Sequence, residues 1–119
     1  MMAIPGKSGE ELEIAEYIRE QLIYAGADPK AIRHDTAHRR TRIRGNVGNL
    51  VFKLPGTYKA PRRMLSAHMD TVPICEGCRP KRVGMKVTSI DKQTGLGADN
   101  RAGCGVVLST ALEILRSGL

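Results

Sequence analysis

The sequence predicts an α/β fold, incomplete as it stands, of the three-layer α/β/α kind with helices packed on a mixed sheet. Three observations predict it: a helical apolar repeat near the N-terminus, several strand-like segments in the middle, and a second helical segment at the end. The 119 residues have the length of one domain, which we expect to span residues 1–119. A composition of 41% hydrophobic and 26% charged residues excludes a disordered chain.

The first predicted helix covers residues 8–25. Its apolar residues recur at helical intervals, at Ile14, Ala15, Ile18, Leu22 and Ala25. Ser8 and Glu11 have the spacing of a capping box, in which each side chain accepts a hydrogen bond from a free backbone N–H. Gly26 is suited to the left-handed position that follows a helix end.

Strands are predicted at four places in the middle of the chain, at residues 40–44, 50–54, 64–67 and 83–90. The segment 64–67 has small and apolar residues on both faces, which is typical of a strand that is covered on both sides. A second helix is predicted from about residue 102 to 116, and we expect it to be deeply buried because it has almost no polar face.

The net charge of +7 is concentrated in residues 30–92, which hold fifteen bases and four acids. On the predicted strand 40–44, Arg40, Arg42 and Arg44 would share one face. Proteins that bind single-stranded nucleic acid interleave aromatic residues for base stacking, and aromatics are 3% of this chain. A solvated basic edge strand is therefore the favoured interpretation. The alternative function is a non-catalytic basic α/β domain that binds nucleic acid or a protein partner.

The first informative motif contains His68 and Asp70, at the end of the predicted buried strand. Side chains two residues apart on a strand lie on the same face. Asp70 could therefore accept a hydrogen bond from one imidazole nitrogen and leave the other nitrogen of His68 free to bind a metal. On its own, such a histidine is more often a satisfied core residue than a ligand.

The second motif is Gly95–Gly103, with Asp99 directly before the second helix. A carboxylate at this place could reach two cations, which lie about 3.5–4 Å apart in two-metal sites. A helix N-cap is the other interpretation of Asp99, and the two roles are compatible. If a shared site exists, the side chains of His68 and Asp99 should lie within about 8 Å of each other.

Together the two motifs resemble a known family. "SAHMDTVP" at 66–73, followed by "LGADNRAG" at 96–103 and an apolar helix, is similar to the di-zinc aminopeptidases of the peptidase T type, which are related to aminoacylases, other deacylases and carboxypeptidases. "IPGKSGEE" at 4–11 and "GNLVFKLPG" at 48–56 resemble the opening of the same family.

The resemblance implies that His68 and Asp99 are metal ligands, that Asp99 bridges two zinc ions, and that Asp70 has a catalytic role by orienting His68. Cobalt or manganese are alternative metals. Asn100 and Arg101 stand where the family often has Asp and Lys, and neither position is a ligand in the family pattern. The implied activity is metal-dependent hydrolysis of short peptides at a free N-terminus.

The family also has a Glu-Glu pair whose first member is the general base, a further acid, a distant histidine and an inserted second domain. We therefore expect the 119 residues to be the N-terminal, truncated portion of a catalytic domain that is inactive alone. The substrate would be a short peptide, and the resemblance leaves a homodimer open. Neither a membrane nor a nucleic acid is an expected partner.

The three cysteines, in a chain without an apolar leader, favour the reducing cytoplasm over a disulfide framework. Cys75 and Cys78 form a lone CxxC in a predicted loop. Inert thiols are the favoured interpretation, because a structural zinc site needs two more ligands, with metal or redox use left as alternatives. No stretch approaches the roughly 20 apolar residues that span a bilayer.

Overall fold

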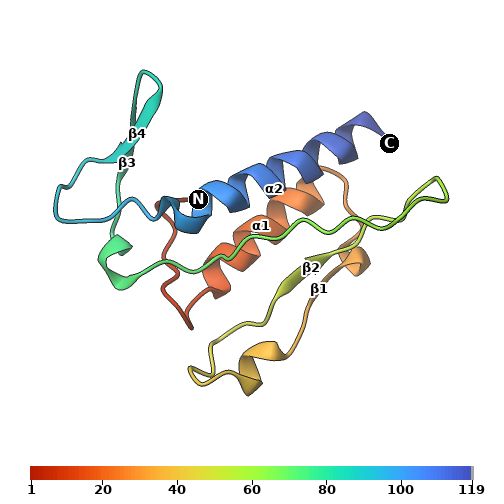
Figure 1. Cartoon of the computed structure of the whole chain (residues 1–119), viewed down its shortest axis with the longest axis horizontal. Helices are drawn as coiled ribbons and strands as arrows, with labels where there is room; N and C mark the ends of the chain where they lie inside the picture. Colours follow the sequence, from red (N-terminus) through yellow and green to blue (C-terminus); the bar gives the residue numbers. More distant parts are fainter. Residues whose placement is uncertain (119) are drawn as a thin grey trace.

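The structure, a computed structural model, describes residues 1–118. Figure 1 shows two helices beside each other, one strand pair packed near them and a second strand pair projecting away. The elements in chain order are α1 (Leu12–Tyr24), η1 (Pro29–Ala31), β1 (Ile32–His34), η2 (Ala37–Arg40), β2 (Leu50–Phe52), η3 (Pro73–Cys75), β3 (Pro80–Val83), β4 (Lys86–Ser89) and α2 (Ala98–Ser117), where η marks short 3₁₀ turns.

The core lies where α1, α2 and the β1–β2 pair meet. Its buried members are Leu22, Ala27, Ile32 and Leu108, with Phe52 among the partly buried side chains packed on them. The apolar spacing of α1 explains this arrangement, because residues three and four apart share one face of a helix. The helical repeat predicted for this segment is therefore the face that builds the core.

The strands form two separate antiparallel pairs. β1 pairs with β2 so that Ile32 lies opposite Phe52, and β3 pairs with β4 through a two-residue turn at 84–85. A single parallel bridge joins Lys7 to Thr71. The α/β class is thus confirmed, whereas the three-layer arrangement with a mixed sheet stays a prediction, since the paired strands of residues 1–118 do not join into one sheet.

The prediction of a strand at 40–44 was wrong. Arg40 ends the 3₁₀ turn η2, and Arg44 has a left-handed φ of 50°, which interrupts an extended strand. The strand that pairs with β2 is instead β1, which precedes this loop. The Asp35 carboxylate closes the loop, because it accepts hydrogen bonds from the backbone N–H groups of Ala37 and Asn49, both at 2.9 Å.

The prediction of a strand at 64–67 was also wrong, because this segment forms no strand within residues 1–118. Met64 is 87% exposed and Leu65 is 61% exposed, so the expected cover on both sides is absent here. The predicted strand 83–90 instead contains the last residue of β3, the turn at 84–85 and the whole of β4, while residues 80–82 of β3 were not predicted.

The two helices are confirmed, with corrections to their details. The prediction that the second helix is deeply buried was wrong, because only Arg101, Cys104 and Leu108 of the 20 residues of α2 are buried. The capping box was also wrong: α1 begins with no side-chain cap, and the Ser8 hydroxyl donates to Asp70 instead. The prediction for the helix end was correct, since Gly26 has a φ of 100°. No helix within residues 1–118 is long and apolar enough to cross a membrane.

We expect Ile14→Ala to lower the free energy of unfolding by about 2–5 kcal/mol, because it empties a fully buried position and leaves a cavity. Leu12→Ala on the same helix is the matched control, since Leu12 is 43% exposed, and it should cost about 1 kcal/mol or less. Urea unfolding followed by circular dichroism measures both. Equal losses in the two variants would contradict the placement of the core under this face of α1.

Candidate functional site

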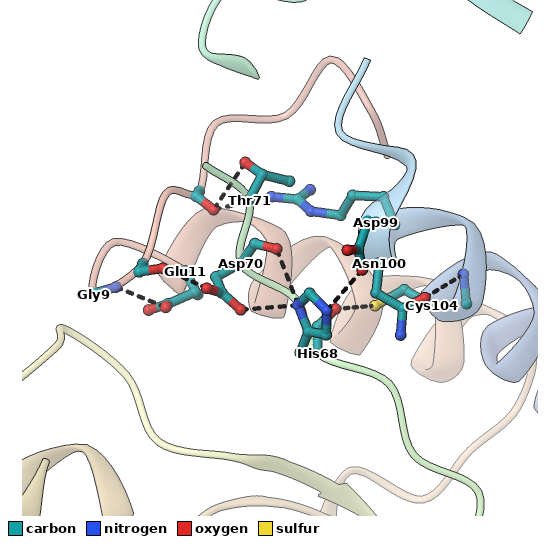
Figure 2. A network of polar contacts seen from close by, with 12 residues as sticks. Gly9, Glu11, His68, Asp70, Thr71, Asp99, Asn100 and Cys104 are labelled. Carbon is teal, nitrogen blue, oxygen red and sulfur yellow. Dashed lines mark hydrogen bonds and ion pairs between the residues drawn. The ribbon is translucent and has the colours of Figure 1, made fainter. Parts of the chain in front are cut away.

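The two motifs that the sequence analysis singled out lie against each other in the structure. His68 and Asp70 lie on the extended segment before η3, and Asp99 lies at the start of α2. Figure 2 shows the His68 ring between the Asp70 and Asp99 carboxylates. Residues 31 positions apart in the sequence thus share one polar cluster.

Asp70 holds one side of the imidazole. The Nδ1 atom of His68 lies 3.0 Å from Asp70 Oδ1, as expected for side chains two apart on an extended segment. The second oxygen of Asp70 accepts a hydrogen bond from the Ser8 hydroxyl. A carboxylate held from two sides in this way fixes the orientation of the ring that it contacts.

Asp99 lies on the other side of the same ring. The Nε2 atom of His68 is 3.0 Å from Asp99 Oδ1, well inside the expected limit. The Asp99 side chain is 95% exposed, so its second oxygen is open to solvent. Behind the ring, the Cys104 thiol donates to the His68 carbonyl at 3.1 Å, which ties α2 to the extended segment.

The residue that caps the second helix is Asn100 rather than Asp99. Both residues have non-helical backbone angles, and the peptide bond between them is cis. The Asn100 side-chain oxygen accepts a hydrogen bond from the backbone N–H of Gly103 at 3.1 Å, the usual contact of an N-cap. A side chain at Gly103 would overlap Asn100, which explains the glycine. The Asp99 carboxylate takes no part in capping.

The donor atoms fit part of a zinc site. Nitrogen and oxygen ligands about 2.0–2.2 Å from a tetrahedral zinc ion are roughly 3.3–3.5 Å apart, so the His68 and Asp99 atoms need only a small shift to share one ion. Asp70 faces the opposite nitrogen and is placed to orient the ring. Within residues 1–118, no group of three or more His, Cys, Asp or Glu side chains converges on one metal position. Within the described residues, His68 and Asp99 are therefore two neighbouring side chains of types that bind zinc, without a third beside them.

The electrostatics of the cluster favour a protonated ring when no metal is bound. Partial burial alone would lower the pKa of His68, but hydrogen bonds to Asp99 and Asp70 outweigh it and raise the pKa above its ordinary 6.5. The contribution of His68 to folding stability is therefore complete below 6.5 and is lost as the pH rises through the raised value. The Ser8 hydroxyl, and then His68, lower the pKa of Asp70, so its contribution is lost as the pH falls below the ordinary 3.8.

Sequence reasoning missed two residues of this cluster. Ser8 looked like a helix cap, because its spacing to Glu11 fits a capping box, and only its place in the "IPGKSGEE" opening connected it with the family. Nothing in the sequence connected Cys104 with His68, since a buried cysteine in an apolar helix is typical of a core. All three cysteines are free, with Cys78 and Cys104 buried and Cys75 half-buried.

We expect the pKa of His68 in the metal-free protein to lie above 6.5 and to fall in both Asp99→Asn and Asp70→Asn, because each variant removes a carboxylate that stabilises the imidazolium. An NMR titration of the histidine ring protons measures it. Glu113→Gln, on the far part of α2, is the control and should leave the value unchanged. A pKa that does not move in Asp99→Asn would contradict the contact between His68 and Asp99.

No protein-family model and no curated protein matches the chain. A solved structure does match it, the crystal structure of a tripeptidase from Staphylococcus aureus subsp. aureus Mu50. The two are 26% identical with a TM-score of 0.81, and the match covers 99% of this chain and 30% of that chain. The chain thus spans about a third of the tripeptidase. The resemblance predicted from the two motifs is confirmed: the chain is similar to the N-terminal part of a peptidase T-like tripeptidase.

Proposed function

We propose that the chain carries part of the active site of a metal-dependent peptidase that acts on short peptides. The observation that carries this proposal is the 3.0 Å approach of His68 Nε2 and Asp99 Oδ1, two atoms of types that zinc binds, brought together from separate motifs. The likeness to a tripeptidase supports the same assignment. A short peptide as substrate, a cytoplasmic location and a pair of zinc ions are parts of this proposal.

The residues divide the work as follows. His68 would bind a zinc ion through its neutral Nε2 atom. Asp70 keeps the ring proton at Nδ1, because its carboxylate accepts a hydrogen bond from that nitrogen. Asp99 offers two carboxylate oxygens, one beside His68 and one toward solvent. A bound zinc pair would supply a water of lowered pKa and would polarise the scissile carbonyl.

The remaining chemistry needs a general base. Within residues 1–118, the carboxylates in contact with His68 are those of Asp70 and Asp99, and both already have roles. Glu113 follows on α2, but it pairs with Arg116 at 3.0 Å on an exposed part of the helix. We therefore propose that these residues act as one part of a larger active site.

The alternative of a nucleic-acid-binding domain has less support. The basic residues of η2 and the loop after it, of the loop at 59–63 and of the β3–β4 hairpin lie on separate parts of the molecule (Figure 1). A binding surface requires its cations to line one continuous path along the phosphates. An affinity for nucleic acid that falls steeply with salt concentration and does not depend on metal would favour this alternative.

Metal binding tests the ligand assignments. Because only His68 and Asp99 supply donors in residues 1–118, we expect any binding of Co²⁺ or Zn²⁺ to be weak, and His68→Ala and Asp99→Ala each to abolish it because each removes a donor. Asp70→Asn should weaken binding by about 10–100-fold, since it loosens the ring without removing a ligand. Titration calorimetry measures this, with Cys75→Ser and Cys78→Ser as controls that should bind normally. An Asp99→Ala variant with wild-type affinity would show that Asp99 is no ligand.

Peptide hydrolysis tests the need for a larger site. We expect the purified 119-residue protein to release no amino acid from a tripeptide with a free N-terminus, with or without added zinc, because the general base is missing from the cluster. Chromatography of the products measures it, and the chelated protein is the control. Metal-dependent release that scales with the concentration of the pure protein would contradict this prediction.

A further inference from the structure

Arg101 is a buried cation beside the candidate site. It lies in the first regular turn of α2, two residues after Asp99, and its exposed fraction is 2%. Arginine is almost never buried to this extent unless a carboxylate pairs with it. Within residues 1–118, none of the ion pairs includes Arg101. The loss of hydration is an unfavourable term that its other contacts must offset.

The contacts of Arg101 are backbone carbonyls of the N-terminal segment. Its Nη1 donates to the Met1 carbonyl at 3.0 Å, and its Nη2 donates to the Gly6 carbonyl at 3.5 Å. The same Gly6 carbonyl accepts hydrogen bonds from the backbone N–H of Thr71 at 3.0 Å and from the Thr71 hydroxyl at 3.4 Å. One oxygen atom therefore joins three segments, namely the N-terminus, the residue after Asp70 and the start of α2.

Gly6 is required for this close approach. Its φ of 154° lies in the region that side chains rarely adopt, and a Cβ there would lie 2.5 Å from Arg101 Nη2. The same Cβ would lie 3.3 Å from Ile14, which is fully buried. The guanidinium thus fills a space that only a glycine leaves open.

The N-terminal segment leads from Arg101 to the site. Residues 1–8, which we call the N-terminal strap, are held at Gly6, bridge to Thr71 through Lys7 and then reach Ser8. The Ser8 hydroxyl donates to the Asp70 oxygen that does not face His68. A displacement of the strap would therefore release Asp70, and with it the ring of His68.

We propose that Arg101 is a positioning residue, which clamps the N-terminal strap so that Ser8 and Asp70 hold His68 toward Asp99. The inference rests on the proposed function in treating this ring as the one that binds metal. Methionine of similar length would fill the space without burying a charge. Lysine would supply one compact ammonium, which cannot donate to two carbonyls in a fixed fork as a guanidinium does.

The test compares Arg101→Met, Arg101→Lys and the control Arg116→Met, which removes an exposed arginine from the same helix. The first readout is the ¹⁵N spectrum of the His68 ring in the metal-free protein, above the pKa of the ring. We expect the wild type to hold its proton on Nδ1, because Nδ1 faces both the carboxylate and the carbonyl of Asp70, whereas Nε2 faces only the exposed Asp99 carboxylate. Arg101→Met should give the averaged shifts of a freely exchanging imidazole. Arg101→Lys should recover part of the wild-type pattern, and Arg116→Met all of it.

The second readout is Co²⁺ affinity, which we expect Arg101→Met to lower by about 10–100-fold, as changes behind a metal ligand typically do. A folded Arg101→Met protein with the wild-type His68 spectrum would overturn the proposal. If that variant does not fold, Ser8→Ala decides, because it breaks the strap at an exposed contact and leaves Arg101 in place. An unchanged His68 spectrum in Ser8→Ala would likewise overturn it, and averaged shifts would support it.

The two proposals can fail separately. Metal binding that survives unchanged in both His68→Ala and Asp99→Ala would remove the ligand assignment on which the proposed function rests. The comparison of metal-free spectra would still decide whether Arg101 positions the ring.

Discussion

The candidate site depends on holding one imidazole between two carboxylates that belong to different segments. His68 meets Asp70 from its own segment and Asp99 from the start of α2, each at 3.0 Å. Such contacts are weak when exposed, because each side chain loses freedom and water competes for it. They persist only where the backbones are already fixed, so the packing behind the site decides its geometry.

That packing comes from a small number of buried groups. Ile14 fills the space beneath Gly6, Cys104 ties α2 to the carbonyl of His68, and Arg101 joins the strap to α2. The Gly6 carbonyl is the common acceptor that brings Thr71 into the same cluster. The side chains of the candidate site are thus exposed to solvent, while the backbone that carries them is held by buried contacts. Such contacts behind a metal ligand fix its orientation.

The fold could be predicted where apolar periodicity was strong, and much of the site where motif and resemblance agreed. The face of α1, the strand at Leu50 and the helix after Asp99 all follow from spacing. Ser8 could not be placed, because its hydrogen bond to Asp70 spans 62 positions and its local spacing equally fits a cap. The prediction of a strand at 40–44 failed because these residues lie in a solvated basic loop, which the Asp35 carboxylate closes. The loop has the same alternating pattern of residues as an edge strand.

The segment 64–67 shows a different limit of sequence reasoning. Its small and apolar residues predict a strand that is covered on both faces, yet Met64 is 87% exposed. The accessible surface of 8914 Å² exceeds by roughly 2,600 Å² what a compact protein of 13.0 kDa has. An excess of that size is comparable to a large protein interface. Exposed apolar side chains at Met64 and Leu65 contribute to this excess, whereas the cluster around His68 is held by buried contacts. The sequence therefore places two exposed apolar side chains, Met64 and Leu65, shortly before a histidine that buried contacts hold in position.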